Sequence, residues 1–268
     1  MRYKIGDVSK ILGISPDLMR YYEKKGIVRP CKDSTNDYRY YEAWDVNFLI
    51  ECLWFKNFGF SMKKISKIVS DCSADELNSL LKDKKDEIAE EIRHKQMILE
   101  RLERQIHSLE TAKKAIGICD VQDSPEMVRY LNRYNFLYDD NPDVQALGRR
   151  WLKYIPFTRR CFYIEEHDLY NLGNDYAWGF SMDMEYVHKL AIKTEPPVVY
   201  QPPRKSVHSV FKQPGKNNFS PRLLDYMVHF AQENHLKLCG YAFGHLLCSV
   251  RENGQLVGYF EAWLPFEE

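Results

Sequence analysis

A helical pattern interrupted by glycine at 5–26 constrains the fold of this chain more than any other feature. Apolar residues recur at helical spacing over 5–12, and Gly13 then ends the helix. Ser15 and Pro16 follow, which are residue types that cap a helix and occupy its first turn. The segment therefore predicts two short helices joined by a turn, which is the helix-turn-helix pattern of DNA-binding proteins.

The residues that follow predict a β-wing beside this unit. A short apolar run at 27–28 precedes a polar tip at 32–37 and the tyrosine-rich run 38–41. Two short strands around a polar turn form such a wing.

Two clusters, Arg20-Tyr21-Tyr22 and Arg39-Tyr40-Tyr41, make the first seventy residues resemble the MerR family of bacterial transcription regulators. Arginine forks and tyrosine hydroxyls are good partners for DNA phosphates. Adjacent residues point in different directions, so one tyrosine of each pair is expected to be core. The candidate DNA-binding residues are Ser15, Arg20, Tyr21, Tyr22, Arg39, Tyr40, Tyr41 and Lys63.

Two further helices are predicted before residue 72. The first covers 42–58, carries an apolar stripe that includes Trp44, and is closed by Gly59. Ser61 caps the second, whose polar side carries Lys63. The resemblance implies that this pair reaches the DNA backbone, and a solvated lysine face is the alternative.

A long helix with heptad character follows the capping-box sequence at 73–76. Apolar residues occupy most core positions of about four heptads over 81–116, and Gly117 ends the helix. Such a stripe needs a partner helix, and a second copy of the chain would supply one. The resemblance implies an antiparallel coiled-coil homodimer, and packing onto the chain's own carboxy-terminal domain is the alternative.

Aromatic residues are concentrated near the carboxyl end, where 25 of 37 lie in 121–268. Alternating patterns predict strands at 127–138, 161–165, 178–184, 198–201, 205–211, 241–250 and 255–264. Helices are predicted at 142–154 and 220–235, and Asn253-Gly254 is predicted to be a two-residue hairpin turn. This order of elements is similar to the GyrI-like effector-binding domain of multidrug-sensing MerR proteins.

The predicted fold class is therefore α+β, in three parts. These are a winged helix-turn-helix domain at 1–72, a linker and long antiparallel coiled-coil dimer helix at 73–117, and a GyrI-like α+β effector domain at 120–268.

A ligand site is predicted from the register of the last hairpin. A two-residue turn pairs Leu246 with Glu261, Gly244 with Trp263, and Cys248 with Tyr259, so Tyr259, Glu261 and Trp263 share one face. A carboxylate between aromatic rings suits a lipophilic cation. A solvated outer face is the alternative. The candidate effector-binding residues are Glu261, Tyr259, Trp263, Gly244, His245, Trp178 and Tyr241.

The sequence departs from the resemblance on the preceding strand, where multidrug-sensing relatives carry a glutamate. Here the position falls on Gly244 or His245, depending on register, so the preference for a cation is less certain to transfer. A histidine at this place is otherwise explained as a residue satisfied within the fold.

Charge is distributed unevenly, although the chain has 38 basic and 38 acidic residues. Residues 1–70 hold thirteen Lys or Arg and eight Asp or Glu, a balance of +5, and the remainder carries −5. The positive part coincides with the predicted DNA-binding domain.

Other classes of site and location are disfavoured. No run of eighteen apolar residues occurs and the first helix begins near residue 5, so we expect a cytoplasmic protein with no membrane partner. Seven scattered cysteines without a CxxC pair argue against disulfides and zinc, and Cys119 has no nearby second thiol to form a soft-metal site. We expect no cofactor and no metal.

These observations predict a ligand-responsive transcription activator. The resemblance implies a homodimer that bends and untwists double-stranded promoter DNA with a long spacer, so that RNA polymerase can use it. The effector is expected to be lipophilic and cationic, with a neutral ligand as the alternative. A hydrolase that uses His245, Glu261 and Tyr259 is a further alternative, as is an architectural DNA-binding protein. We expect no enzymatic activity.

Overall fold

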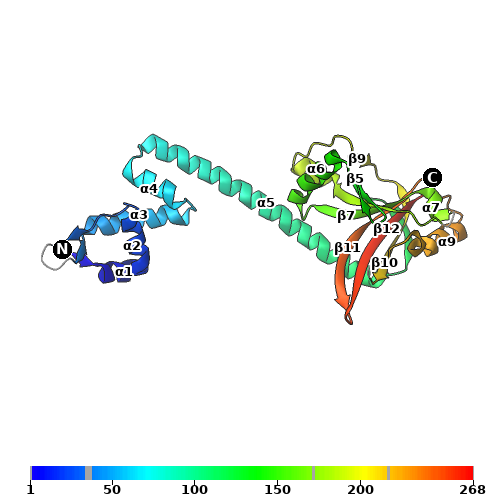
Figure 1. Cartoon of the computed structure of the whole chain (residues 1–268), viewed down its shortest axis with the longest axis horizontal. Helices are drawn as coiled ribbons and strands as arrows, with labels where there is room; N and C mark the ends of the chain where they lie inside the picture. Colours follow the sequence, from blue (N-terminus) through cyan, green and yellow to red (C-terminus); the bar gives the residue numbers. More distant parts are fainter. Residues whose placement is uncertain (1, 34–37, 171–172, 216–217, 268) are drawn as a thin grey trace. The chain divides into compact units, whose positions relative to one another are not determined.

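The computed structural model describes residues 2–33, 38–170, 173–215 and 218–267. The chain divides into two compact units, Met1–His94 and Lys95–Glu268 (Figure 1). Each unit is described by itself below. Within the described residues, no helix combines the length and the apolar character needed to cross a membrane.

The first unit begins with the predicted helix pair. Helix α1 (Ile5–Leu12) ends at Gly13, whose φ of 64° lies in the left-handed region that glycine adopts without strain. Helix α2 (Pro16–Lys24) begins at Ser15, whose hydroxyl accepts a hydrogen bond from the backbone N–H of Leu18 at 3.2 Å. Both helices are thus set by the local signals in the sequence.

The wing is formed by three short strands in the order β1-β3-β2 within the described residues. They are β1 (Tyr3–Lys4), β2 (Cys31–Lys32) and β3 (Arg39–Tyr41). The prediction that the first wing strand lies at 27–28 was wrong. Ile27 and Val28 are buried in the core of the unit, where apolar contacts hold them without strand pairing. Positions 34–37 of the predicted tip lie outside the described residues.

Helices α3 (Ala43–Asn57) and α4 (Met62–Ser70) follow as predicted, with Ser61 capping the second. The apolar stripe of α3 is narrower than expected, because Trp44 is 80% exposed and does not join the core. The core takes Val46, Leu49, Cys52 and Phe55 instead, which are spaced three or four residues apart on one side of the helix.

Helix α5 (Ala74–Ala115) is 42 residues long and begins with the predicted capping box. The Glu76 carboxylate accepts a hydrogen bond from the backbone N–H of Ser73 at 2.8 Å, and the Ser73 hydroxyl accepts one from the N–H of Glu76 at 3.2 Å. Gly117, with a φ of 74°, follows the helix end.

In the second unit, α5 packs on the carboxy-terminal domain with one side only. Met97 and Ile98 contact the domain's apolar cluster, and the Gln105 amide donates a hydrogen bond to the carbonyl of Leu247 at 2.9 Å. Among the described residues, four apolar residues of the heptad stripe on α5 are more than half exposed within the single chain: Ile92, Leu99, Leu102 and Ile106. One face of α5 therefore packs on the chain's own carboxy-terminal domain, while the apolar stripe that is predicted to form the dimer stays exposed.

Nine of the described strands of the second unit form one sheet, in the order β4-β10-β12-β11-β7-β8-β5-β6, with β9 paired to β5. The strands are β4 (Cys119–Asp123), β5 (Met127–Tyr134), β6 (Leu137–Tyr138), β7 (Thr158–Ile164), β8 (Ala177–Asp183), β9 (Val199–Gln201), β10 (Lys205–Pro214), β11 (Ala242–Glu252) and β12 (Gln255–Pro265). The helices are α6 (Pro142–Trp151), η1 (Leu152–Tyr154), α7 (Glu166–Tyr170), α8 (Met184–Lys189), η2 (Pro221–Leu224) and α9 (Asp225–Glu233).

Most predicted strands are present, with three differences. The predicted strand 127–138 is two strands, because Asn135 adopts a φ of 48° and turns the chain between β5 and β6. The predicted strand 178–184 ends one residue early, since Met184 begins α8. The short elements β4, α7 and α8 were not predicted.

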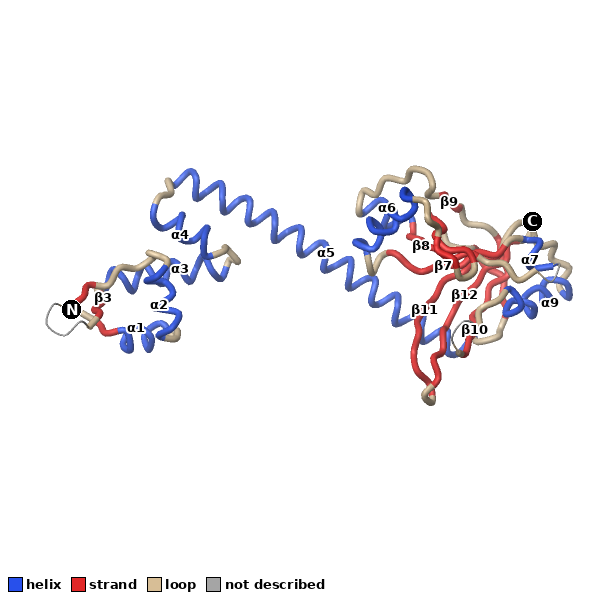
Figure 2. Tube along the Cα trace, viewed as in Figure 1, coloured by secondary structure: helices blue, strands red, loops and turns tan. Residues whose placement is uncertain are grey.

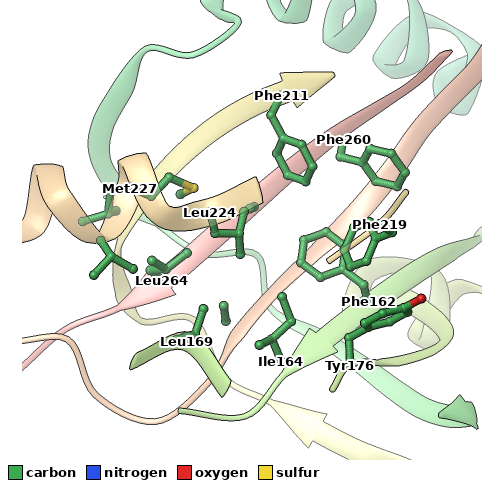
Figure 3. Packing of buried hydrophobic residues seen from close by; sticks show 14 of the residues in the cluster. Phe162, Ile164, Leu169, Tyr176, Phe211, Phe219, Leu224, Met227, Phe260 and Leu264 are labelled. Atoms are coloured by element: carbon green, nitrogen blue, oxygen red, sulfur yellow. The ribbon is translucent and has the colours of Figure 1, made fainter. Parts of the chain in front are cut away.

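The helices α6 and α9 pack against different parts of the same side of the sheet (Figure 2). We call this side the helix face and define it by Val128, Phe162, Trp178, Met182 and Phe260, which join these two apolar clusters. Figure 3 shows Phe162, Phe219 and Phe260 packed together beside the helix that carries Met227. Ring centroids of Phe162 and Phe219 lie 4.9 Å apart.

The opposite side of the sheet carries charged and polar residues. We call it the polar face and define it by Arg129, Arg159, Ser181, His245 and Glu261, which alternate along their strands with helix-face residues. Aromatic side chains of the same side complete it, and Trp263 packs with Phe243 and Met127.

Candidate functional site

A basic groove of about 600 Å³ lies where α1, α2 and the wing of the first unit meet. It is lined by Lys4, Ile5, Gly6, Asp7, Lys10, Arg20, Tyr38 and Arg39. Four of these side chains are basic and one is acidic, so the groove attracts anions. A groove of this charge beside a helix-turn-helix fits a DNA backbone phosphate.

The structure brings Arg20 and Arg39 together at this groove, although they are far apart in sequence. The Arg20 guanidinium lies 2.7 Å from the Asp17 carboxylate, and that of Arg39 lies 2.9 Å from the Glu23 carboxylate. The Arg20–Asp17 pair is exposed, and such surface ion pairs contribute little net stability, so phosphate oxygens could replace the Asp17 carboxylate. The Glu23 side chain is only 14% exposed, so its carboxylate holds the exposed Arg39 guanidinium from below.

The tyrosine pairs divide between core and surface. Tyr22 and Tyr41 are fully buried, so their inclusion among the DNA-binding candidates was wrong. The Tyr41 hydroxyl donates a hydrogen bond to Glu23, and burial and this carboxylate raise the pKa of Tyr41. Tyr21 is exposed and Tyr40 is half-buried, as expected for the outward members of each pair.

The other two DNA-binding candidates lie at helix starts. The Ser15 hydroxyl is occupied as the cap of α2, and Lys63 is exposed on the first turn of α4. Sequence reasoning missed Lys4 and Lys10, which line the groove. Their spacing before and along the first helix gave no sign that they would face the wing.

The last hairpin has the predicted turn, but its pairing follows the predicted register only from the turn to Cys248. Asn253 and Gly254 both have positive φ, and Cys248 pairs with Tyr259 as expected. An extra residue, Leu247, then bulges out of β11, so His245 pairs with Glu261. The predicted pairing of Leu246 with Glu261 was therefore wrong.

The same bulge corrects the placement of Gly244. This residue pairs with Ala262, and a Cβ atom built on it would lie 2.4 Å from the Phe162 ring, which belongs to the helix face. Gly244 thus leaves no space beside Trp263, which pairs with Phe243. Trp178 also packs in the helix-face cluster with Phe219. Gly244 and Trp178 therefore lie on the opposite side of the sheet from Glu261.

Four effector candidates do share the polar face: His245, Tyr259, Glu261 and Trp263. Glu261 lies 3.7 Å from the Arg159 guanidinium and 3.5 Å from His245 Nδ1. Burial acts to raise the pKa of Glu261, but His245 and Arg159 outweigh it and lower that pKa. Burial lowers the pKa of His245, so its imidazole is neutral near pH 7. The carboxylate of Glu261 thus already faces a cation within the chain, the Arg159 guanidinium, which also pairs with Asp183.

Tyr259 and Tyr241 are engaged elsewhere on this face. The Tyr259 hydroxyl donates a hydrogen bond to Glu252 near the hairpin turn, so it does not complete a group with His245 and Glu261. The Tyr241 ring lies 4.5 Å from that of Tyr163, centroid to centroid.

A second cavity of about 230 Å³ lies next to α7, where β5 and β7 end and β8 begins. It is lined by Leu131, Tyr134, Asn135, Tyr163, Glu165, Asp168, Asp175, Tyr176 and Ala177. Asp168 and Asp175 are held in place: Asp168 accepts from the backbone N–H of Asp175 at 3.4 Å, and Asp175 accepts from the Asn135 amide at 2.7 Å. Burial and the Glu165 carboxylate raise the pKa of Tyr163 to about 12. The cavity combines aromatic walls with three carboxylates.

Sequence reasoning did not find this cavity. Its acids belong to the junction of β7 and α7, to α7 itself and to the loop before β8, and none of these segments has a periodic pattern. The signal available in the sequence was the run of acids at 165–168 directly after a predicted strand.

Known proteins resemble mainly the first unit. Residues 3–72 match the family model described as MerR HTH family regulatory protein. The HTH-type transcriptional regulator CueR of Escherichia coli is 35% identical over 66 residues, which is 25% of this chain and 49% of CueR. HmrR of Sinorhizobium medicae, also an HTH-type transcriptional regulator, is 33% identical over 66 residues, or 25% of this chain and 45% of HmrR. The chain thus spans about half the length of these curated relatives.

Two solved structures were also compared. The MerR family regulator HiNmlR, which lacks the sensor domain and is bound to promoter DNA, is 25% identical and covers 42% of this chain and 90% of its own, with a TM-score of 0.33. EcmrR in its DNA complex is 19% identical and covers 99% of this chain and 100% of its own, with a TM-score of 0.37. Residues 3–72 of this chain are therefore similar to the MerR HTH family of regulatory proteins.

Proposed function

We propose that this chain is a ligand-responsive transcription regulator that binds double-stranded promoter DNA through residues 1–72 and a small effector through residues 120–268. One observation carries the proposal. The chain joins a basic groove on a MerR-family helix-turn-helix domain to a second unit with a cavity lined by tyrosines and carboxylates. A DNA-binding domain with a ligand cavity in the same chain is the composition of a sensor.

We propose that the regulator is a cytoplasmic homodimer assembled through residues 73–117. Two DNA-binding domains related by two-fold symmetry fit the two halves of a near-palindromic promoter. Activation would follow if the dimer distorts a promoter with a long spacer into a form that RNA polymerase uses. Such a deformation costs several kcal/mol. The effector can shift this balance only by its different affinity for the two conformations.

We propose that the effector is a lipophilic cation and that it binds in the 230 Å³ cavity. Aromatic rings attract a cation, and a nearby carboxylate balances a charge that would be costly to desolvate. Glu165 is the cavity acid assigned to this role, because Asp168 and Asp175 accept hydrogen bonds from Asp175 and Asn135, whereas Glu165 interacts with the hydroxyl of Tyr163, an aromatic wall of the cavity. Glu261 is less suited, since the Arg159 guanidinium already lies 3.7 Å from its carboxylate.

The binding of matched ligands tests this assignment. Benzyltrimethylammonium and its neutral isostere neopentylbenzene have the same shape and differ in charge. The full chain should bind the cation more tightly, and Glu165→Gln should remove that preference while Glu261→Gln preserves it. Loss of the preference in Glu261→Gln but not in Glu165→Gln would assign the cation site to Glu261 instead. Equal binding of both ligands by the parent protein would rule out a cation effector.

Transcription in vitro tests the regulatory role. With the promoter upstream of the chain's own coding sequence, the cation should increase transcript yield, and it should do so less with Glu165→Gln. A cation that binds but leaves transcription and promoter affinity unchanged would contradict a sensing function.

A further inference from the structure

A buried arginine on the polar face, Arg129, lacks an acidic partner. Its residue surface is 7% exposed, and among the described residues the one hydrogen bond of its side chain runs from Nε to Oε1 of Gln201 at 3.1 Å. The neighbouring Arg159 differs, because it pairs with both Asp183 and Glu261. The guanidinium lies over the rings of Tyr163 and Tyr241, which attract it, but no carboxylate among the described residues pairs with it, so an anion would bind favourably there.

Other unpaired groups surround it. The side-chain nitrogen of Gln201, the indole N–H of Trp263 and the hydroxyl of Ser181 are buried with no hydrogen-bond partner in the part of the chain that the structure describes. Ser181 pairs directly with Arg129 across β8 and β5, and Gln201 pairs with Met127 two residues before it. The Gln201 nitrogen and the Trp263 indole can only donate, and Arg129 also only donates. The Ser181 hydroxyl and one ring nitrogen of His245, which also has no hydrogen-bond partner among the described residues, can accept, so donors outnumber acceptors on this part of the polar face.

This group of donors adjoins the carboxylate-lined cavity. Tyr163 lines the cavity, and the Arg129 guanidinium carbon lies 4.2 Å from the centroid of its ring. Leu131 also lines the cavity and lies on β5 two residues after Arg129, a distance of about 7 Å along a strand. The Tyr163 ring thus lies between the carboxylate-lined cavity, which favours cations, and the Arg129 guanidinium, which favours an anion.

We propose that the effector is amphoteric. Its positive group occupies the cavity beside Glu165, and a carboxylate on the same aromatic molecule reaches past Tyr163 to Arg129 and the Gln201 amide. Arginine suits this role because its fork accommodates a carboxylate with two parallel hydrogen bonds. The inference rests on the proposed function and narrows its ligand class from lipophilic cations to aromatic zwitterions.

Two compounds with one scaffold test the inference: the zwitterion 4-(aminomethyl)benzoate and its methyl ester, which keeps the ammonium and loses the carboxylate. Titration of the full chain, followed by tryptophan fluorescence, should show at least about tenfold tighter binding of the zwitterion, as one charge-assisted pair supplies. Arg129→Gln should bring the two affinities together. Arg160→Gln is the matched control, because Arg160 stacks on Trp178 on the helix face, and it should preserve the preference.

A second variant distinguishes loss of carboxylate binding from loss of folding in Arg129→Gln. Gln201→Glu supplies Arg129 with a carboxylate from within the chain, so the protein should fold while the zwitterion loses its advantage. Equal affinity of the parent for zwitterion and ester would overturn the inference, as would a preference that survives both variants. In either case, ester binding that depends on Glu165 would leave the proposed function standing. Failure of the ester to bind the parent would contradict the proposed cavity itself.

Discussion

The exposed apolar stripe of α5 predicts a dimer whose strength can be worked out from the structure. Leu99, Leu102 and Ile106 are 57%, 53% and 57% exposed in the single chain. Full burial of such a side chain contributes about 2 kcal/mol, so covering the exposed half contributes about 1 kcal/mol. In a two-fold dimer each substitution counts twice. Leu99→Ala should therefore weaken association by about 2 kcal/mol, which raises the dimer Kd about thirtyfold.

Charged substitutions at the same stripe should have a larger effect. Leu99→Glu combined with Leu102→Glu removes two apolar contacts per chain and places like charges at the seam. This variant should be monomeric and should bind promoter DNA weakly, because each monomer holds one half-site.

Sedimentation velocity over a concentration series measures both effects. Leu152→Ala is the matched control, since Leu152 is similarly exposed at 50% but lies on η1, outside the stripe. It should leave the association unchanged. A parent protein that stays monomeric, or a double glutamate variant with an unchanged dimer mass, would refute the reasoning.

Three further predictions concern DNA, packing and pH. Arg20→Ala and Arg39→Ala should each weaken binding to all DNA sequences and lower the slope of log affinity against log salt by about one. Lys63→Ala should have a smaller effect on both quantities. Fluorescence anisotropy over a salt series measures them, and equal effects of the three substitutions would contradict the prediction. Gly244→Ala should lower the free energy of unfolding by about 3 kcal/mol in urea titrations, since the new Cβ would lie 2.1 Å from the Glu261 carbonyl oxygen. Gly6→Ala is the control and should not destabilise the protein, because no atom lies within 4 Å of the new Cβ. The pKa of His245 is lower in the folded than in the unfolded chain, so below about pH 6.5 the unfolded chain binds more protons. The free energy of unfolding should therefore fall as pH drops through that value, and His245→Gln should reduce the fall. An unchanged pH dependence in this variant would show that other groups dominate.

Local signals in the sequence predicted the elements whose ends are set by a single residue. Gly13, Gly59 and Gly117 end helices through positive φ, and Ser15 and Ser61 begin them through side-chain caps. These choices depend on neighbours within four residues, so they can be read from the chain itself.

The polar-face register and the cavity could not be predicted in the same way. The bulge at Leu247 lies within the last hairpin, and no turn residue in the sequence marks it. The acids of the cavity come from three separate places, so only the folded sheet brings them near Tyr163. The exposure of Trp44 likewise reflects packing around α3, which periodicity alone does not decide.

The bulge at Leu247 also affects how homologous sequences should be aligned with this one. Between the turn and the bulge, opposed residues can be found by counting equal steps from Asn253-Gly254, but beyond it the count on β11 is one residue longer. A relative without the extra residue would carry the equivalent of His245 at a position that a gap-free alignment assigns to Leu246. Alignments of this hairpin therefore need a one-residue gap at 247, or the residues opposite Glu261 will be compared with residues from the helix face.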